Sequence, residues 1–321
     1  MTAVERVKRA IKMESPDRIP LIIYNRDHDR SDMVPIEVIH HFMGPGRDTS
    51  EFGFQWEIPD KTMGQPKEAL IRELSEIEGF RFPDPNDPLR FKDVRPIMEK
   101  YGGKYFVANL SLTGFTIMTF LRGFEDTLFD IEVEPEAMNR LADGVFGFEE
   151  DVIRLAGGQG FHAVAFFDDW GTQGSTIISP KKWREFFKPR YRRQFELCHE
   201  LGMDVYFHCC GYIMDIIGDF IEIGVDILNL SQPNIFDVPE LGRRFGGKVC
   251  FMCPVSYQTT SLSGTREEIF ADAKLLMDNL AVGGGGLIGY VEDYSSMGMS
   301  EENYQSCIDA FLMQAPGASG A

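Results

Sequence analysis

The chain lacks several features that would place it in common classes of protein. No apolar run approaches the ~20 residues that a membrane-spanning helix needs. Basic side chains are few: 32 Lys and Arg stand against 50 Asp and Glu, giving a net charge of −18, so nucleic acid and anionic membrane surfaces are unfavourable partners. Six cysteines in 321 residues are too few for a disulfide scaffold. Because the N-terminus also lacks an apolar signal segment, we expect a cytoplasmic protein with reduced thiols.

Nucleotide-binding motifs are also missing. There is no Walker motif, and the glycine cluster 283–286 precedes a predicted strand, whereas a dinucleotide-binding loop follows one. A hydrophobic content of 43%, with 12% aromatic residues, is ample for a folded core. Without an internal repeat or a clear boundary, we expect one domain spanning residues 1–321, with only the last few residues disordered.

Short apolar runs alternate with helical patterns along the chain. The runs are apolar nearly throughout, which is typical of parallel strands buried on both faces. The seven predicted strands cover residues 18–24, 104–110, 162–167, 203–208, 225–230, 248–253 and 285–291. The segments between them have apolar residues at helical spacing, as in residues 141–155, 213–221 and 269–280. This pattern predicts an α/β fold, a TIM-type (β/α)8 barrel with N-terminal helical and irregular extensions, and an eighth strand within residues 25–100. An open doubly wound sheet is the alternative.

The clearest chemical signal is the segment His208-Cys209-Cys210-Gly211, which closes the strand 203–208. Side chains on a strand alternate between its faces, so His208 and Cys210 point the same way and Cys209 points oppositely. An imidazole and a thiolate at a strand end are a natural pair of zinc ligands, although a buried cysteine is often only a small apolar residue. The remaining loop and helix histidines are predicted to be ordinary surface or cap residues: His28, His40, His41 and His199.

Other strand ends supply further candidate ligands. Cys253 ends the strand 248–253 and is predicted to lie at the level of Cys210, while Cys250 has the opposite parity and is predicted to be a core residue unless a bulge shifts the register. Glu292 follows the last strand and offers a carboxylate. Thiolates, an imidazole and a carboxylate converging from several strands suit Zn²⁺.

Polar residues follow most of the predicted strands, where the mouth of a barrel lies. Asp168 and Asp169 follow the strand 162–167; one is predicted to be an N-cap or turn residue, and the other to contact substrate or orient a zinc ligand. Asp168 and Asp169 are therefore both candidate catalytic residues. The candidate substrate-binding residues at this end of the barrel are Asn25, Asn109, Asn229, Gln232 and Tyr290.

Three segments of the chain resemble the uroporphyrinogen decarboxylase superfamily. They are ERVKRAIKMESPDRIPL at 5–21, FFDDWGTQGSTIISPKKWREFFKPRY at 166–191 and GMDVYFHCCGYIMDIIGDFIEIGVDILNLSQP at 202–233. The resemblance implies a TIM-type barrel. Decarboxylases of the superfamily open with an arginine-rich motif that PLIIYNRDHDR at 20–30 does not match. The methyltransferase branch, which works with a corrinoid protein, has His-x-Cys-Gly as here, so the resemblance implies that His208 and Cys210 bind zinc.

Within that branch the sequence is most similar to O-demethylase methyltransferases. This likeness implies a small methoxylated, aromatic substrate and a corrinoid (cobalamin) carried by a partner protein. The acidic composition already argues against a nucleic acid or membrane partner, and a homo-oligomer stays open. Relatives that use coenzyme M have a cysteine ligand after the last strand, where this chain has GYVEDYSSMG at 289–298. The third ligand is therefore open between Cys253, Glu292 and Cys250.

Three alternatives remain at this stage. The chain could be a methylcobamide methyltransferase that delivers methyl to a thiol or to tetrahydrofolate. A metal-free decarboxylase would need basic residues around the pocket, whereas the candidate mouth residues are mostly acidic or neutral. A corrinoid-protein-binding module with a structural, fully coordinated zinc would have no catalytic activity of its own.

Overall fold

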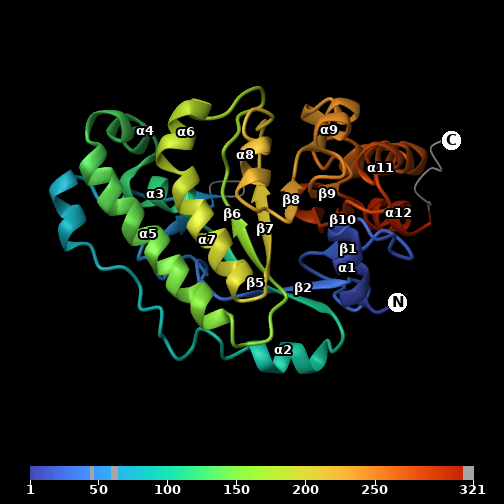
Figure 1. Ribbon diagram of the computed structural model, residues 1–321, viewed down its shortest axis with the longest axis horizontal. Coiled ribbons are helices and arrows are strands. Elements are labelled where there is room, and N and C mark those ends of the chain that lie inside the picture. Colours follow the sequence, from blue (N-terminus) through green and yellow to red (C-terminus); the bar gives the residue numbers. More distant parts are fainter. Residues whose placement is uncertain (44–46, 59–63, 314–321) are drawn as a thin grey trace.

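Eight parallel strands close into a barrel in the computed structural model, which describes residues 1–43, 47–58 and 64–313. The order around the barrel is β1-β10-β9-β8-β7-β6-β5-β2, so a closed barrel is confirmed over an open sheet (Figure 1). The predicted disordered end falls on residues 314–321, outside the described part. The barrel strands are β1 (Leu21–Ile23), β2 (Met33–Glu37), β5 (Tyr105–Leu112), β6 (Ala163–Phe167), β7 (Asp204–Cys209), β8 (Ile227–Leu230), β9 (Cys250–Pro254) and β10 (Leu287–Val291).

All seven predicted strands are present, and β2 is the eighth. It lies between β1 and β5, where Ile22 pairs with Met33 and Pro35 pairs with Val107. The sequence did not reveal β2 because it is short and contains a proline, which argues against a central strand. A separate two-stranded sheet, β3 (Trp56–Glu57) with β4 (Gln65–Pro66), belongs to the irregular N-terminal extension.

Helices surround the barrel: in Figure 1, α5 and α7 lie to the left of β6 and β7, and α11 and α12 lie on the opposite side. The helices are α1 (Ala3–Ile11), α2 (Val94–Lys100), α3 (Gly114–Arg122), α4 (Phe124–Val133), α5 (Pro135–Ala156), α6 (Pro180–Phe186), α7 (Lys188–Glu200), α8 (Ile217–Glu222), α9 (Val238–Phe245), α10 (Thr260–Ser263), α11 (Arg266–Leu280) and α12 (Glu301–Leu312). The predicted helix at 213–221 begins only at Ile217, because residues 211–216 form the loop that follows β7. Within the described residues, no helix combines the length and the apolar character that crossing a membrane requires.

The core has two layers, one inside the barrel and one between the barrel and its helices. Ile22, Met33, Tyr206 and Met252 belong to the inner layer. The residues that alternate with them along each strand, such as Phe207, pack in the outer layer against the helices. Residue parity along a strand therefore decides whether a side chain reaches the barrel interior or the helical shell.

One histidine differs from its predicted role as a surface or cap residue. His41 is only 1% exposed and stacks against Phe52 and Phe54. Its Nε2 donates to the carbonyl oxygen of Leu112 at 3.0 Å, and burial lowers the pKa of the imidazole to about 4. It is a buried residue that joins the N-terminal extension to the end of β5. The prediction was wrong because the burial depends on contacts that no local sequence pattern reveals.

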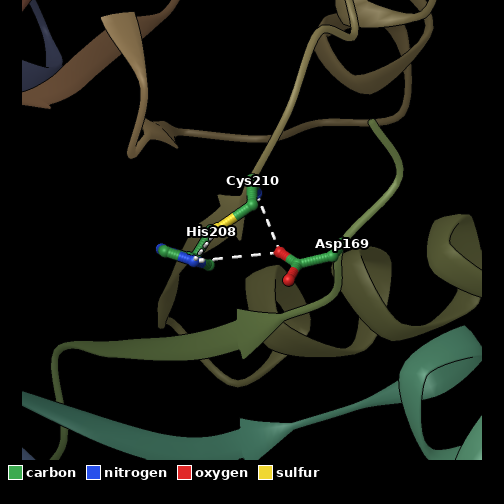
Figure 2. A group of neighbouring side chains, drawn as sticks. All are labelled: Asp169, His208 and Cys210. Atoms are coloured by element: carbon green, nitrogen blue, oxygen red, sulfur yellow. Dashed lines mark hydrogen bonds and ion pairs between the residues drawn. The ribbon is translucent and has the colours of Figure 1, made fainter. Parts of the chain in front are cut away.

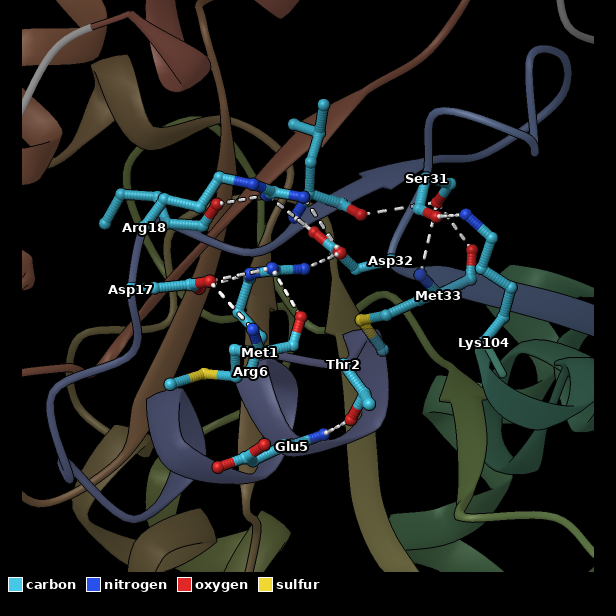
Figure 3. A network of polar contacts seen from close by, with 12 residues as sticks. Met1, Thr2, Glu5, Arg6, Asp17, Arg18, Ser31, Asp32, Met33 and Lys104 are labelled. Atoms are coloured by element: carbon cyan, nitrogen blue, oxygen red, sulfur yellow. Dashed lines mark hydrogen bonds and ion pairs between the residues drawn. The ribbon is translucent and has the colours of Figure 1, made fainter. Parts of the chain in front are cut away.

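A polar network joins α1 to the first strands (Figure 3). The buried carboxylate of Asp32 accepts from Arg6 at 2.6 Å and from Arg18 at 2.7 Å, and it also accepts from the backbone N–H of Leu21 at 2.8 Å. Arg6 continues to Asp17, which is 41% exposed. One buried aspartate thus joins the N-terminal helix, the segment before β1 and the start of β2.

Candidate metal centre

Asp169, His208 and Cys210 converge at the carboxyl ends of β6 and β7 (Figure 2). One ligand atom from each residue lies within 4.8 Å of the other two. His208 Nε2 is 3.6 Å from Cys210 Sγ and 4.0 Å from Asp169 Oδ1. Among the described residues, this is the one group of three or more His, Cys, Asp or Glu side chains with such spacing.

Strand register places the histidine and the cysteine on the same face. Phe167 of β6 pairs with His208 of β7, and Tyr206, two residues before His208, lies in the inner core. Cys209, between His208 and Cys210, is buried in the outer core and donates no ligand to the group. The alternation of side chains along β7 is therefore the local reason why His208 and Cys210 meet.

The loops after β6 and β7 continue the contact of the two strands. The backbone N–H of Cys210 donates to Asp169 Oδ1 at 2.8 Å, and the N–H of Gly171 donates to the carbonyl oxygen of Cys210 at 3.2 Å. Gly171 and Gly211 touch through their backbones: a Cβ on Gly211 would lie 2.0 Å from the oxygen of Gly171. Gly211 also has a φ of +79°. Only glycine allows this approach, which brings Asp169 to the pair on β7.

His208 is held on two sides. Its ring stacks on Phe167 with centroids 4.5 Å apart, and its Nδ1 lies 2.6 Å from Asn229 Oδ1. These contacts leave Nε2 facing Cys210 and Asp169. An imidazole held through one nitrogen presents the other in a fixed direction, as metal-ligating histidines do.

Cys210 lies in surroundings that disfavour a free thiolate. Burial, followed by the charge of Asp169, raises the pKa of its thiol well above the ordinary value. Ser231 Oγ donates to Cys210 Sγ at 3.0 Å, which favours the thiolate. A cation bound beside the sulfur would supply the remaining stabilisation, because metal ligation deprotonates a thiol.

The donor set fits a zinc ion. Bonds of ~2.3 Å to sulfur and ~2.0 Å to nitrogen place the two ligand atoms about 3.5 Å apart in a tetrahedral site. The 3.6 Å between Cys210 Sγ and His208 Nε2 agrees with that value. Asp169 adds a carboxylate whose side chain is 52% exposed, so this side of the group is open to solvent. Three protein ligands and an open position are typical of a catalytic zinc.

Asp168, predicted from the sequence as a candidate catalytic residue, does not belong to this group. Its carboxylate is buried and accepts from the backbone N–H groups of Phe115 and Thr116, each at 2.8 Å. It also accepts from the hydroxyl of Tyr191. Asp168 therefore caps the N-terminus of α3, and burial raises its pKa to about 7. Of the two adjacent acids, Asp168 has the capping role and Asp169 reaches the mouth.

Cys253 and Cys250 also lie away from the group. Cys253 packs in the outer core against the helices, so its sulfur points away from Cys210. Cys250 faces the barrel interior but pairs with Ile227 near the start of β8, well below the mouth. The parity predicted for β9 is thus wrong: Cys250 and Met252 face the barrel interior and Cys253 faces the helices. The strand is apolar throughout, so its sequence fits either face.

Glu292 faces the mouth from the end of β10. Its Oε2 accepts from the hydroxyl of Tyr290 at 2.7 Å and from that of Tyr294 at 3.0 Å. Its charge contributes to the raised pKa of Cys210, but its oxygens lie outside the 4.8 Å group. The structure thus brings Asp169, and not Glu292, to the histidine and cysteine.

The predicted substrate-binding residues hold the mouth together. Asn25 bonds the backbone of Asp293, joining the loops after β1 and β10. Gln232 Oε1 accepts from the N–H of Gly211 at 2.8 Å and so supports the loop that carries Cys210. Asn229 is fully buried and contacts His208, as described above. These three amides are engaged within the protein, so their placement indicates support of the site.

Aromatic rings form a second feature of the mouth; Tyr290 was predicted there from the sequence, and Tyr24 was missed. Asn109 Nδ2 donates to the hydroxyl of Tyr24 at 3.1 Å, and Tyr24 lies 5.8 Å from Tyr290 and 5.9 Å from Phe167, centroid to centroid. Phe167 in turn contacts Tyr206 at 5.8 Å. The signal was present: Tyr24 directly follows β1, where a side chain reaches the mouth. Together these rings make an aromatic floor next to His208.

A closed parallel barrel with a three-residue ligand group at its carboxyl end defines a (β/α)8-barrel protein with a metal-type site. Its family follows from the sequence: residues 49–310 match the uroporphyrinogen decarboxylase (URO-D) family, and the chain belongs to that family. No curated protein matches the sequence.

Solved structures agree with the fold. A methyltransferase from Methanosarcina mazei superposes with a TM-score of 0.77 at 16% identity, covering 98% of this chain and 99% of that one. A D-psicose 3-epimerase gives a TM-score of 0.46 at 8% identity, covering 88% of each chain. At these identities the first likeness supports the fold alone, and the second carries no argument.

Proposed function

We propose that this protein is a zinc-dependent methyltransferase that moves a methyl group from an O-methyl donor, a phenyl methyl ether, to the Co(I) corrinoid of a partner protein. The observation that carries the proposal is the convergence of Asp169, His208 and Cys210 at the open end of the barrel. Membership of the URO-D family and the fold shared with a methyltransferase agree with it.

The donor set favours an oxygen substrate. One imidazole, one thiolate and one carboxylate make a harder donor set than two thiolates and an imidazole would. A metal ion held by the harder set binds an ether oxygen better than a thiol. Bound there, zinc supplies Lewis acidity to the oxygen on which negative charge develops. Since the corrinoid brings the nucleophile, the chain needs no nucleophilic side chain of its own. These points favour O-demethylation over transfer to a thiol.

The protein's own residues bind and orient the donor. Tyr24 and Phe167 offer ring faces beside His208, against which an aromatic ring can pack. Asp169 and Glu292 make the mouth acidic, and Arg26, a nearby cation, is held by Asp293 and Glu301. A tetrapyrrole carboxylate would find no free positive partner among these residues, which disfavours the decarboxylase alternative.

The test replaces the two central ligands. We expect His208→Ala and Cys210→Ala to lose bound zinc and to reduce demethylation of methoxylated aromatics by more than about 100-fold, since even changes behind a ligand cost 10–100-fold. Zinc is measured by elemental analysis, and turnover with the corrinoid protein supplied.

Controls separate the ligands from their neighbours. Cys253→Ala removes a thiol that lies in the outer core, away from the ligand group, so this variant should keep its zinc. Asp169→Asn should weaken zinc binding more than Glu292→Gln. Full zinc content and turnover in the His208 and Cys210 variants would overturn the proposal.

A further inference from the structure

Asn229 lies directly behind the histidine of the ligand group. It is on β8, is 0% exposed, and is paired with His208 in the strand register. Its Oδ1 lies 2.6 Å from His208 Nδ1 and accepts from the hydroxyl of Tyr206 at 3.2 Å. Its Nδ2 donates to the carbonyl oxygen of Met252 at 2.8 Å. Both ends of this buried amide are therefore engaged.

These contacts fix the orientation of the amide. A flipped Asn229 would place its oxygen against the carbonyl oxygen of Met252, and two acceptors would then face each other without a proton. The amide nitrogen thus belongs with Met252, and the amide oxygen faces His208. Because that oxygen only accepts, Nδ1 of His208 must carry the proton.

The proton on Nδ1 determines what the other nitrogen can do. A neutral imidazole has one N–H donor and one lone pair, so Nε2 keeps the lone pair. Nε2 is the atom that lies 3.6 Å from Cys210 Sγ and 4.0 Å from Asp169 Oδ1. Stacking on Phe167 fixes the plane of the ring and directs that lone pair into the group.

We propose that Asn229 is a positioning residue that selects the Nδ1–H tautomer of His208 and thereby makes Nε2 a ready metal ligand. This inference rests on the proposed function, since it concerns the same site. It assigns Asn229 a role behind the metal ligand in place of the substrate contact that the sequence predicts. A neutral amide performs this task without adding a third negative charge beside Asp169 and Glu292.

The tautomer can be measured without metal. Protein labelled with ¹⁵N-histidine is studied by long-range ¹H–¹⁵N NMR about two pH units above the ordinary histidine pKa of ~6.5. His208→Gln identifies the His208 signals. We expect Nδ1–H in the wild-type protein and in Asn229→Asp, which keeps an acceptor. We expect a population of Nε2–H in Asn229→Leu, which removes it.

A matched control tests the direction of the effect. Tyr206→Phe removes the other hydrogen bond to Asn229 Oδ1 and should leave the His208 tautomer unchanged. In zinc competition with a chelator, Asn229→Leu should bind about 10–100-fold more weakly than the wild type. Asn229→Asp keeps the acceptor for His208 but places a second oxygen against the carbonyl oxygen of Met252, so it should bind zinc more weakly than the wild type and more tightly than Asn229→Leu. A purely structural role of the amide would not produce this order.

The outcomes separate this inference from the proposed function. Nε2–H in the wild-type protein, or an unchanged tautomer in Asn229→Leu, would overturn the role of Asn229. The wild-type measurement decides this point even if a variant fails to fold. Nδ1–H in a wild-type protein that binds no zinc would instead overturn the proposed function while the tautomer selection stands.

Discussion

Glu149 is a buried carboxylate that binds the N-terminus of α3 alongside Asp168. It lies in α5, is 1% exposed, and accepts from the N–H of Gly114 at 2.7 Å and from Gln194 at 2.6 Å. Together with Asp168 it binds the first free N–H groups of α3. Burial raises the pKa of Glu149 from 4.5 to about 8, so this acid is largely protonated at neutral pH.

This raised pKa predicts a loss of stability with rising pH. Between pH 4.5 and about 8 the folded protein holds a proton on Glu149 that the unfolded chain releases. The free energy of unfolding therefore falls across this window, by up to ~1.4 kcal/mol per pH unit for this group. Asp168, whose pKa is also raised, acts in the same direction.

Glu149→Gln should reduce the pH dependence of stability. The substituted side chain keeps an acceptor for Gly114, and its amide offers a donor to Gln194 Oε1, which has no hydrogen-bond partner among the described residues. Guanidinium unfolding midpoints across pH 5–8 provide the measurement, with Glu136→Gln, an exposed residue of the same helix, as control. Equal slopes for Glu149→Gln and the wild type would contradict the expectation.

At the scale of elements, the two loops after β6 and β7 act as one unit. Neither loop alone has the geometry of the site: Asp169 comes from the loop after β6, Cys210 begins the loop after β7, and His208 lies near the end of β7 itself. The glycine contact between Gly171 and Gly211 sets their distance. Substitutions at these glycines are therefore expected to act on metal binding although neither residue offers a ligand.

Gly211→Ala should destabilise the protein by about 2 kcal/mol or more and weaken zinc binding. The added Cβ would meet the backbone of Gly171, and the φ of +79° is itself unfavourable for alanine. Gly174→Ala, in the same loop as Gly171 but with nothing within 4 Å of the added carbon, should change neither property. Thermal unfolding and zinc titration of both variants test this, and equal behaviour of the two would exclude the role of the glycine contact.

At the scale of the whole molecule, the site and the main polar network lie at different ends of the barrel. The candidate ligand group Asp169, His208 and Cys210 lies at the carboxyl ends of the strands, while α1 packs Val7 and Ala10 into the inner core near the strand starts. Asp32 fastens this helix through Arg6 and Arg18 (Figure 3). Substitutions at the end of the barrel where the strands start can therefore lower the stability of the fold without directly changing the site.

Asp32→Ala should lower the free energy of unfolding by about 3–5 kcal/mol, because it leaves two guanidinium groups without their buried partner. Asp17→Ala removes an exposed partner of Arg6 and should cost at most about 1 kcal/mol. Denaturant unfolding measures both. If the two variants lost the same stability, the buried carboxylate would not be the main link.

The sequence allowed the barrel and the proximity of His208 and Cys210 to be predicted. Seven strands were visible as apolar runs, and the alternation of a single strand was enough to place His208 and Cys210 on one face. The third member of the group was harder to predict. The third ligand stayed open between Cys253, Glu292 and Cys250. The parity of β9 turns Cys253 outward, and Asp169 was predicted only as one of two adjacent acids that could contact substrate or orient a zinc ligand.

The sequence by itself determined those features that depend on near neighbours in the chain: strand periodicity, the His-x-Cys spacing and the acidic composition. Tertiary structure decided the features that depend on contacts between strands. The register of β6 against β7 and the approach of Gly171 to Gly211 brought Asp169 to the pair. A buried polar group must form hydrogen bonds with whatever partner the fold places beside it. For this reason Asp168 caps α3, and Asn229 contacts His208 on the side away from the ligand group.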